Sequence, residues 1–323
     1  MKSNNDEHRH ILEMVSHLFY VEHMNQQEIS DKLFISRSQI SRLLQEAREQ
    51  GIVEINIHYS ARRNYTLEPQ LISRFGLAAA YVMSPYSDSG ITDFNKRFFN
   101  MGADVIQTSL CSNMVFGITW GSSVAGVVRA LRPTTSLTGV EIVQVMGSPL
   151  IENPSFDTDG LLQTLSGKLS GTPHHMPVPL MVPDLAAYEI LCKDTQISSI
   201  MNLASFSDLL LTGIGTLHDV MISQHSWLGY MTPEMLTELK EKKAVGSICA
   251  RFFDIDGNIL DCNWNKYCMG ITLDKIQKME QVVAVAHGVE KADAILGALR
   301  GHFINILITD SETCNTIMER ANQ

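Results

Sequence analysis

A glycine-containing turn near the middle of the chain carries residues suited to holding an anion. It runs from Val115 to Ser123 (Val-Phe-Gly-Ile-Thr-Trp-Gly-Ser-Ser), where Thr119, Ser122 and Ser123 supply hydroxyls and Gly121 lets a ligand approach the backbone closely. We expect a helix to begin at Ser122, and the free N–H groups and partial positive charge of a helix N-terminus suit a phosphate. A tight turn with a serine cap is the structural alternative.

Two further glycine turns follow segments that we expect to be inner strands of a sheet. One contains Gly147, and the other contains Gly213 and Gly215. Glycine is the ordinary residue of turns, so each turn alone is weak evidence. Together they would converge on one rim of a parallel sheet, where such sheets bind ligands.

Two charged residues complete this predicted binding site. Asp254 follows an expected strand, and its carboxylate can accept hydrogen bonds from sugar hydroxyls; the alternative is a turn-forming aspartate ahead of Asp256-Gly257. Lys291 lies at the start of an expected helix, where a cation is unfavourable unless an anion is bound; the alternative is a solvated surface lysine. The eleven histidines show no His-x-x-x-His spacing and the six cysteines no Cys-x-x-Cys pair, so we predict no metal site and no cofactor.

Residues 25–51 have the pattern of a helix-turn-helix. Ser36 followed by Gln39 fits a capping box at the start of the second helix, and Gly51 lies where that helix would stop. Arg can pair with guanine, Gln with adenine, and Ser with either base or with phosphate. The predicted DNA-binding residues are therefore Gln26, Arg37, Ser38, Gln39, Ser41 and Arg42. An ordinary pair of surface helices is the alternative.

The turn of this motif and the segment after it carry two further signals. Many such motifs have glycine in the turn, but this chain has Phe34-Ile35, so we expect either some backbone strain there or a turn of another type. After Gly51, the alternation of Val53, Ile55 and Ile57 indicates a strand and hence a winged arrangement.

The charge distribution bears on how the chain would bind DNA. The formal net charge is −10. Residues 1–63 contain eight Lys and Arg against nine Asp and Glu, a net charge of −1, which leaves −9 for residues 64–323. One such domain would make few phosphate contacts, so we expect a homo-oligomer, a dimer or tetramer, on repeated half-sites of operator DNA.

The rest of the chain alternates between strand-like and helix-like segments. Apolar strands, each followed by a helix, indicate a parallel sheet covered by helices on both faces, and hence an α/β domain. The predicted strands are 78–83, 114–118, 140–145, 208–212, 282–286 and 304–308, and the predicted helices after residue 90 are 93–110, 122–131, 233–243, 290–299 and 312–320. We therefore predict a helix-turn-helix domain over 1–58, a linker over 59–66 and a ligand-binding and oligomerisation domain over 67–323.

Composition excludes several other classes of protein. The 323 residues are 45% hydrophobic and 19% charged, which is typical of globular domains. There is no run of 18 apolar residues and no apolar signal core at the N-terminus, so we expect a cytoplasmic protein without a membrane partner.

Several segments, taken in order along the chain, resemble the SorC family of bacterial sugar-responsive transcriptional regulators. They are Ser41-Arg42-Leu43-Leu44, Gly117-Ile118-Thr119-Trp120-Gly121, Gly213-Ile214-Gly215, Phe253-Asp254-x-x-Gly257, and Lys291…Ala294-Ile295…Ala298-Leu299-Arg300-Gly301…Ile308-Thr309-Asp310. The resemblance implies an effector domain like the sugar-phosphate isomerases and deaminases, and a phosphorylated sugar or polyol as effector. It implies a phosphate at Thr119, Gly121, Ser122, Ser123 and Lys291, and hydroxyls at Asp254 and the Gly147 and Gly213 turns.

One position departs from the family. Where the family often has two adjacent glycines, this chain has His287-Gly288, and an imidazole there would narrow the pocket or contact a hydroxyl. Our sequence-based hypothesis is a transcriptional regulator of a carbohydrate or polyol operon controlled by a phosphorylated sugar. The alternative is an isomerase- or deaminase-like enzyme fused to a DNA-binding domain, with Asp254, Asp256 and His287 as candidate acid–base groups.

Overall fold

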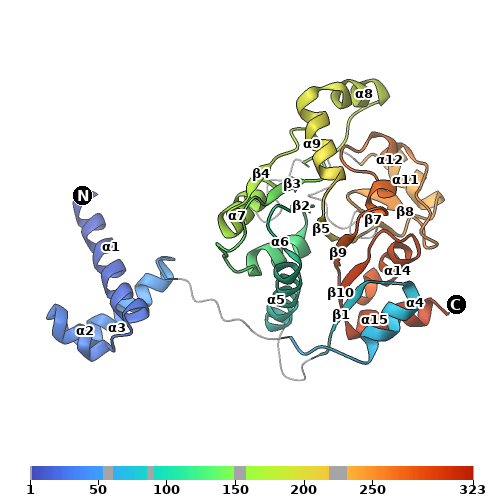
Figure 1. Ribbon diagram of the computed structural model, residues 1–323. Coiled ribbons are helices and arrows are strands. Elements are labelled where there is room, and N and C mark those ends of the chain that lie inside the picture. Colours follow the sequence, from blue (N-terminus) through green and yellow to red (C-terminus); the bar gives the residue numbers. More distant parts are fainter. Residues whose placement is uncertain (1, 54–60, 86–90, 149–157, 218–230, 323) are drawn as a thin grey trace. The chain divides into compact units, whose positions relative to one another are not determined.

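The computed structural model describes residues 2–53, 61–85, 91–148, 158–217 and 231–322 (Figure 1). The chain divides into two compact units, Met1–His58 and Tyr59–Gln323.

The first unit contains three helices around a small apolar core. Helix α1 (Lys2–Ser16) continues into one π-helical turn, η1 (His17–Val21), and is followed by α2 (Gln26–Leu33) and α3 (Arg37–Glu49). The buried side chains of the core are Val15, Leu18, Ile29, Ile40 and Leu44. Both α2 and α3 begin with a capping box, because the side chains of Asn25 and Ser36 accept hydrogen bonds from backbone N–H groups of the first turn.

The predicted strain in the turn between α2 and α3 is confirmed at one residue. Phe34 ends α2 in the left-handed conformation, with φ +56° and ψ +35°. That conformation costs a residue with a Cβ roughly 1–2 kcal/mol. Gly51 has φ +69°, as expected for the residue after α3. Ile55 and Ile57, the later residues of the predicted wing, lie outside the described residues.

The second unit is built on a seven-stranded parallel sheet, which confirms the prediction of a parallel α/β domain. The strand order is β1-β10-β9-β5-β2-β3-β4, and every pair is parallel. The strands are β1 (Ala79–Met83), β2 (Val115–Ile118), β3 (Glu141–Gln144), β4 (Thr172–His174), β5 (Leu209–Gly213), β9 (Gln281–Val285) and β10 (Ile306–Asp310).

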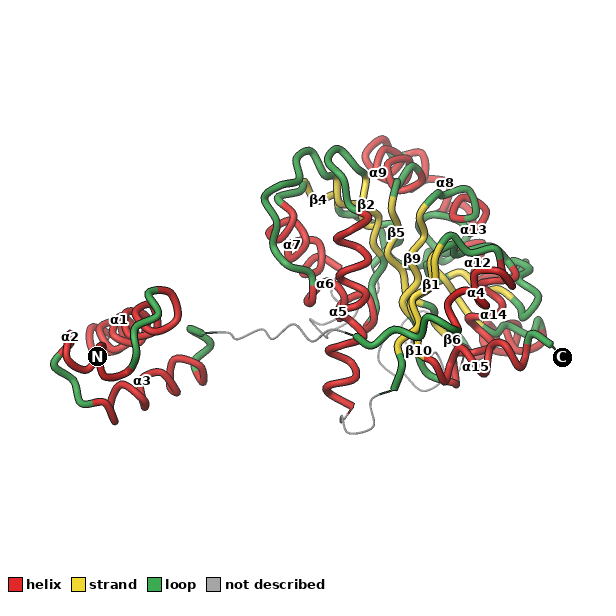
Figure 2. Tube along the Cα trace, turned by 60° about the horizontal axis from the view of Figure 1, so that its bottom comes forward, coloured by secondary structure: helices red, strands yellow, loops and turns green. Residues whose placement is uncertain are grey.

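Helices cover both faces of this sheet (Figure 2). Alternate residues of the inner strands point into two different apolar clusters: Val283 and Val285 into one, Val282 and Ala284 into the other. The first cluster lies under α5 (Ile91–Ser109), α6 (Ser122–Ala130) and α7 (Thr158–Leu169). The second lies under α4 (Leu67–Phe75), α9 (Thr195–Ser205), α11 (Pro233–Glu241), α14 (Ala292–Arg300) and α15 (Ser311–Arg320).

A smaller antiparallel sheet follows β5 in the chain. It consists of β6 (Gly215–Thr216), β7 (Gly246–Ile248) and β8 (Arg251–Phe253). The remaining short helices of the large unit are α8 (Leu185–Lys193), α12 (Asn263–Tyr267) and α13 (Leu273–Ile276). Part of the predicted linker belongs to the large unit, since Asn64 donates its backbone N–H to Val82 and Arg62 accepts from Ser84.

Candidate functional site

The parallel register brings the predicted turns to one rim of the sheet, the carboxyl edge, which we define as the ends of β10, β9, β5, β2 and β3. Ile118 pairs with both Leu211 and Gln144, and Gly213 pairs with Val285. Neighbouring strands lie about 4.8 Å apart. The segments after Ile118, Gly213 and Val285 are therefore side by side.

The turn between β2 and α6 leaves a helix N-terminus facing this edge. Gly121 precedes the first residue of α6 and has φ +133°, a conformation that favours glycine. Within the described parts of the chain no side chain caps α6 there, and a methyl group on Gly121 would meet no described atom within 4 Å. Ser122 is exposed and Ser123 half-buried, so neither side chain is enclosed in the core.

The Thr119 hydroxyl is buried, whereas the sequence analysis expected it to be open to a ligand. Thr119 is 2% exposed, and its Oγ1 is buried without a hydrogen-bond partner among the described residues. Strand alternation is the reason, because Thr119 points to the same face as Gly117, where a Cβ would touch Val145 and Ser207. The Thr119 backbone remains at the edge, but its hydroxyl does not face solvent.

Lys291 and the turn after β5 meet at the edge. Lys291 ends the single 3-10 turn η2 (Val289–Lys291), is half-buried, and donates from Nζ to the carbonyl oxygen of Ile214 at 3.2 Å. The ammonium is thus held between Gly213 and Gly215. A methyl group on Gly213 would meet no atom of the described residues within 4 Å, whereas one on Gly215 would lie 2.9 Å from Ser247 Oγ. Gly213 therefore borders open space, and Gly215 packs against the small sheet.

Gly147 is packed inside the protein and does not border the open rim of the sheet. A Cβ at Gly147 would lie 2.2 Å from the carbonyl oxygen of Pro179, and the residue is buried. Its N–H donates to Met269 O at 3.1 Å, and its carbonyl accepts from Trp120 Nε1 at 3.4 Å. The glycine is required because two protein backbones approach closely, so we leave Gly147 out of the candidate site.

The Asp254 carboxylate is likewise occupied by hydrogen bonds within its own turn. Its carboxylate accepts from the backbone N–H groups of Asp256 and Asn258 and from Asn258 Nδ2, at 2.9 to 3.0 Å. Its carbonyl oxygen lies against Gly297, near the C-terminal end of α14, whereas Lys291 directly precedes that helix. The six residues from Lys291 to Gly297 correspond to a rise of about 9 Å along the helix. The turn-forming interpretation of Asp254 holds, and the carboxylate is not at the carboxyl edge.

His287 lies at the edge beside two aromatic rings of α5. Its imidazole contacts Phe98 edge-on at a centroid distance of 4.6 Å and Phe94 at 5.3 Å. Burial lowers the pKa of His287 below its ordinary value; the Asp310 carboxylate opposes this shift, and the Lys291 ammonium adds to it. At neutral pH the site therefore presents a neutral imidazole.

Two further residues shape this corner, and the sequence analysis gave them no role. Asp310 caps α15 by accepting from the N–H groups of Glu312 and Thr313. Asp310 and Thr313 also accept from the Gly288 N–H, at 3.1 and 2.8 Å. The Asp-x-x-Thr spacing at a strand-to-helix junction is the signal that could have indicated this cap. These bonds fix the backbone that carries His287.

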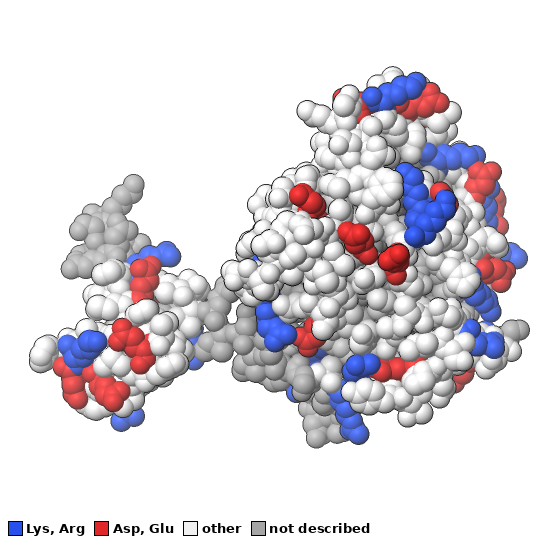
Figure 3. Space-filling view, viewed as in Figure 1, with Lys and Arg blue, Asp and Glu red and all other residues white. Residues whose placement is uncertain are grey.

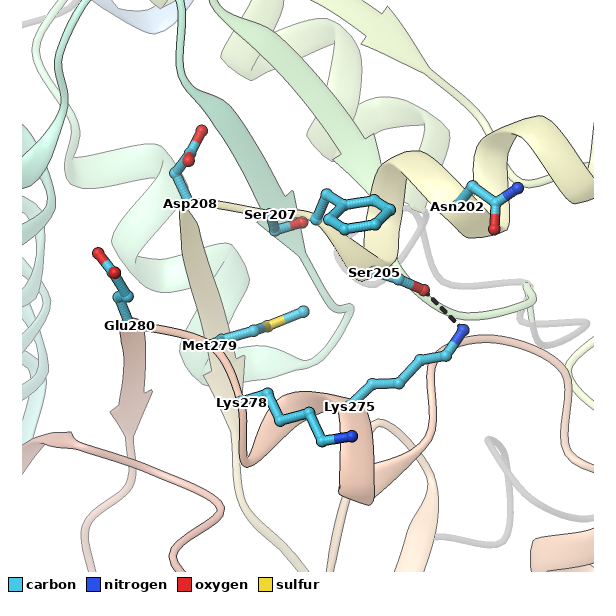
Figure 4. A pocket seen from close by; sticks show the side chains of 9 residues that line it. Asn202, Ser205, Ser207, Asp208, Lys275, Lys278, Met279 and Glu280 are labelled. Atoms are coloured by element: carbon cyan, nitrogen blue, oxygen red, sulfur yellow. Dashed lines mark hydrogen bonds between the residues drawn. The ribbon is translucent and has the colours of Figure 1, made fainter.

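A pocket of about 430 Å³ lies at the opposite rim, before β5 and β9 (Figure 4). Its lining mixes charges of both signs from Asp208, Lys275, Lys278 and Glu280. Lys275 Nζ donates to Ser205 Oγ at 2.9 Å, and Asp208 accepts from Val115 N–H at 2.8 Å. The mixed charge gives this pocket no preference for an anion, so it does not compete with the carboxyl edge.

In the small unit, the side chains predicted to contact DNA lie mostly in solvent. Arg37, Ser38, Gln39, Ser41 and Arg42 of α3 are exposed, and Gln26 is half-buried. Gln39 has an additional structural role, since its Oε1 accepts from Ser36 Oγ at 2.9 Å in the capping box. Acidic and basic side chains are interspersed on the face of this unit seen in Figure 3.

The described parts of the chain show neither a metal site nor a membrane-spanning helix. They contain no group of three or more His, Cys, Asp or Glu side chains placed to hold a metal ion. Among the described helices, none is long and apolar enough to cross a membrane.

Comparison with known proteins extends these observations. Residues 59–319 match the family model of a putative sugar-binding domain. The deoxyribonucleoside regulator of Bacillus subtilis (strain 168) is 31% identical over 303 residues, which cover 93% of this chain and 95% of that protein. The sorbitol operon regulator of Klebsiella pneumoniae is 30% identical over 318 residues, covering 98% and 99%.

Solved structures of other transcriptional regulators share the fold of this chain. The crystal structure of the full-length sorbitol operon regulator SorC from Klebsiella pneumoniae aligns with a TM-score of 0.72 and 28% identity, over 97% of this chain and 99% of that one. A transcriptional regulator from Streptococcus pneumoniae TIGR4 aligns with a TM-score of 0.76 and 25% identity, over 80% and 98%. Given the match to the sugar-binding model, the near full-length match to the sorbitol regulator and the shared fold, the chain belongs to the SorC family of sugar-binding transcriptional regulators.

Proposed function

We propose that this chain regulates a carbohydrate or polyol operon, and that a small phosphorylated sugar bound at the carboxyl edge changes its DNA affinity or its activity on DNA. The observation that carries the proposal is that Lys291, which donates to Ile214, the N-terminus of α6, which no described side chain caps, and Gly213 all lie at the ends of neighbouring strands. A cation beside free helix N–H groups is an arrangement that stabilises a phosphate.

The proposed effector site consists of Gly121, Ser122, Ser123, Gly213 and Lys291, with the backbone of Thr119. His287 adds a neutral imidazole next to it, which suits a hydroxyl of the effector better than a second phosphate. A ligand with one phosphate and several hydroxyls fits this combination of charge and hydrogen-bonding groups.

The proposed DNA contacts are Arg37, Ser38, Ser41 and Arg42 on α3, with Gln39 and Gln26 at the edge of the contact. In a helix-turn-helix the N-terminal part of the second helix enters the major groove. Because residues 1–63 have a net charge of −1, we infer that at least two copies bind together, on half-sites related by the symmetry of a homo-oligomer.

The enzyme alternative needs an acid and a base on the same substrate. Asp254 and Asp256 lie near the C-terminal end of α14, where Asp256 pairs with Arg300 at 3.5 Å, and His287 lies before its N-terminal end. The three groups proposed for catalysis are therefore separated. The relatives reported above are named as regulators, which favours binding without turnover.

The test is a mobility-shift titration of the full-length protein on DNA from upstream of its own gene, at low salt, with and without a panel of pentose, hexose and polyol phosphates. An allosteric coupling of about 1–3 kcal/mol would change the apparent DNA affinity about 5- to 150-fold. If no duplex shifts under any ligand, the regulatory proposal is wrong. Analysis of the sugar phosphates after incubation detects isomerised or deaminated products and so tests the enzyme alternative.

Two variants separate the two binding functions. Arg42→Ala should weaken DNA binding and leave the stabilisation by effector unchanged. Ser122→Asp should do the reverse, because its carboxylate would repel the phosphate, while Ser122→Asn provides a neutral control of similar size. Circular dichroism of all three verifies that folding is retained.

A further inference from the structure

Phe34, in the turn between α2 and α3, adds backbone strain to the small unit and gains no stabilisation from burial of its ring. Its backbone adopts the left-handed conformation that glycine occupies without strain. Its side chain is 95% exposed, the largest value among the exposed large apolar side chains of the described residues. The strain disfavours phenylalanine at this position, and the exposed ring does not offset it in the isolated protein.

The ring makes no compensating contribution to the core of its unit. Phe34 lies outside the apolar cluster formed by Ile29, Ile40 and their neighbours, whereas the next residue, Ile35, packs against that cluster. The turn is thus held in place by Ile35 and by the Ser36 cap. Phe34 is available to contact a molecule outside the chain.

The surroundings of the ring indicate the chemistry of that molecule. The exposed residues near Phe34 in the chain are Asp31 and Lys32 before it and Ser36, Arg37 and Ser38 after it. Phe34 and Arg37 are three positions apart, so their Cα atoms are at most about 11 Å apart. All other large apolar side chains of residues 25–50 are buried or half-buried. A protein partner would require a continuous apolar patch, which the exposed side chains of residues 25–50 do not form. A single ring among hydroxyls and charged groups fits duplex DNA, where apolar thymine methyls lie between phosphates and polar base edges.

We propose that Phe34 is a DNA-contacting residue that packs its ring against a thymine methyl group at the rim of the major groove, next to the bases reached by the start of α3. This inference rests on the proposed DNA-binding function and adds an apolar contact to its polar ones. It also accounts for a strained residue where glycine would be more stable, because strain of this kind persists where a function requires the side chain.

The experiment uses full-length protein and a duplex that the wild-type protein enriches from a random library. Phe34→Gly and Phe34→Asn both suit a left-handed turn, so each should unfold at the same or a higher urea concentration than the wild type. We expect their affinity for the enriched duplex to fall about five- to tenfold, the size of a single altered base contact. A loss of DNA affinity without a loss of stability would not arise from a damaged fold.

Replacing thymines one at a time by deoxyuridine removes single methyl groups and locates the contact. At one thymine the substitution should weaken wild-type binding and leave Phe34→Gly binding unchanged. Equal affinity of wild type and both variants would overturn the proposal, as would an equal effect of every deoxyuridine on wild type and variant. If sedimentation shows that the variants bind weakly because they dissociate into monomers, the ring contacts another protein copy and the DNA assignment is wrong. Failure of the wild type to enrich any duplex would instead remove the regulatory function itself.

Discussion

Adding one methyl group at Gly213 is the sharpest test of where the effector binds. Gly213 ends β5 at the carboxyl edge, and it is not among the glycines with positive φ, so alanine can adopt its backbone conformation. A Cβ built there meets no described atom within 4 Å. Gly213→Ala therefore leaves the packing of the protein intact and places a methyl group in the space assigned to the ligand.

The structure gives the direction and size of both effects. At a compatible position, replacing Gly by Ala stabilises a protein by about 0.4–1 kcal/mol, because the unfolded chain loses conformational freedom. Crowding a filled site by one methyl group costs about 1–3 kcal/mol, which corresponds to about a 5- to 150-fold loss of effector affinity. Stability should thus rise slightly while effector binding falls.

The assays are urea unfolding without ligand and calorimetric titration with the best phosphosugar found for the wild type. Gly167→Ala is the matched control, because Gly167 lies in α7, away from the carboxyl edge, and a methyl group there also meets nothing within 4 Å. It should stabilise the protein by about 0.5–1 kcal/mol and leave effector affinity unchanged. If Gly213→Ala binds effector as tightly as Gly167→Ala does, the end of β5 does not contact the ligand and our assignment of the site is wrong.

Two further predictions concern His287 and Asp254. Burial lowers the pKa of His287 below 6.5, so the unfolded chain binds a proton first as the pH falls, and the contribution of this residue to stability is lost between its ordinary pKa and its lowered one. His287→Gln should therefore reduce the difference in ligand-free unfolding free energy between about pH 8 and pH 5; an unchanged difference would contradict the burial of the imidazole. Asp254→Ala removes three accepted hydrogen bonds and should cost about 1–3 kcal/mol in urea unfolding, whereas effector affinity measured by titration should stay the same. A loss of affinity without a loss of stability would return Asp254 to the binding site.

The structure contains the predicted strands and helices where the local sequence pattern favours the same element that the sheet requires. The strand at β2 and the helix at α6 were predicted within a residue or two, because a buried apolar run followed by a serine-rich turn is both locally favourable and required by the sheet. The region from 158 to 205 was not assigned at all, although it holds α7, β4, α8 and α9. Helix α8 is apolar at nearly every position, so its sequence has no polar face that would reveal a helical period.

The structure brings only some of the predicted site residues to one rim, and those that it places elsewhere share one feature. Gly121, Ser122, Gly213 and Lys291 are brought to one rim, as the order of strands and turns implied. Glycine and aspartate, however, serve turns and close packing as readily as ligands. Gly147 and the Asp254 turn were therefore indistinguishable, in sequence, from ligand-binding turns.

The sequence by itself determined the local features of this protein: the capping box at Ser36, the left-handed glycine at position 51, the alternation of strands and helices, and the family to which the chain belongs. Each depends on residues a few positions apart or on an ordered set of motifs. Only the tertiary structure decided which polar groups remain available to a ligand. Thr119 turns into the interior, Gly147 is covered by the backbone at Pro179, and Lys291 reaches the carbonyl of Ile214. Whether such a group is free depends on contacts between segments far apart in the chain, which spacing along the sequence does not encode.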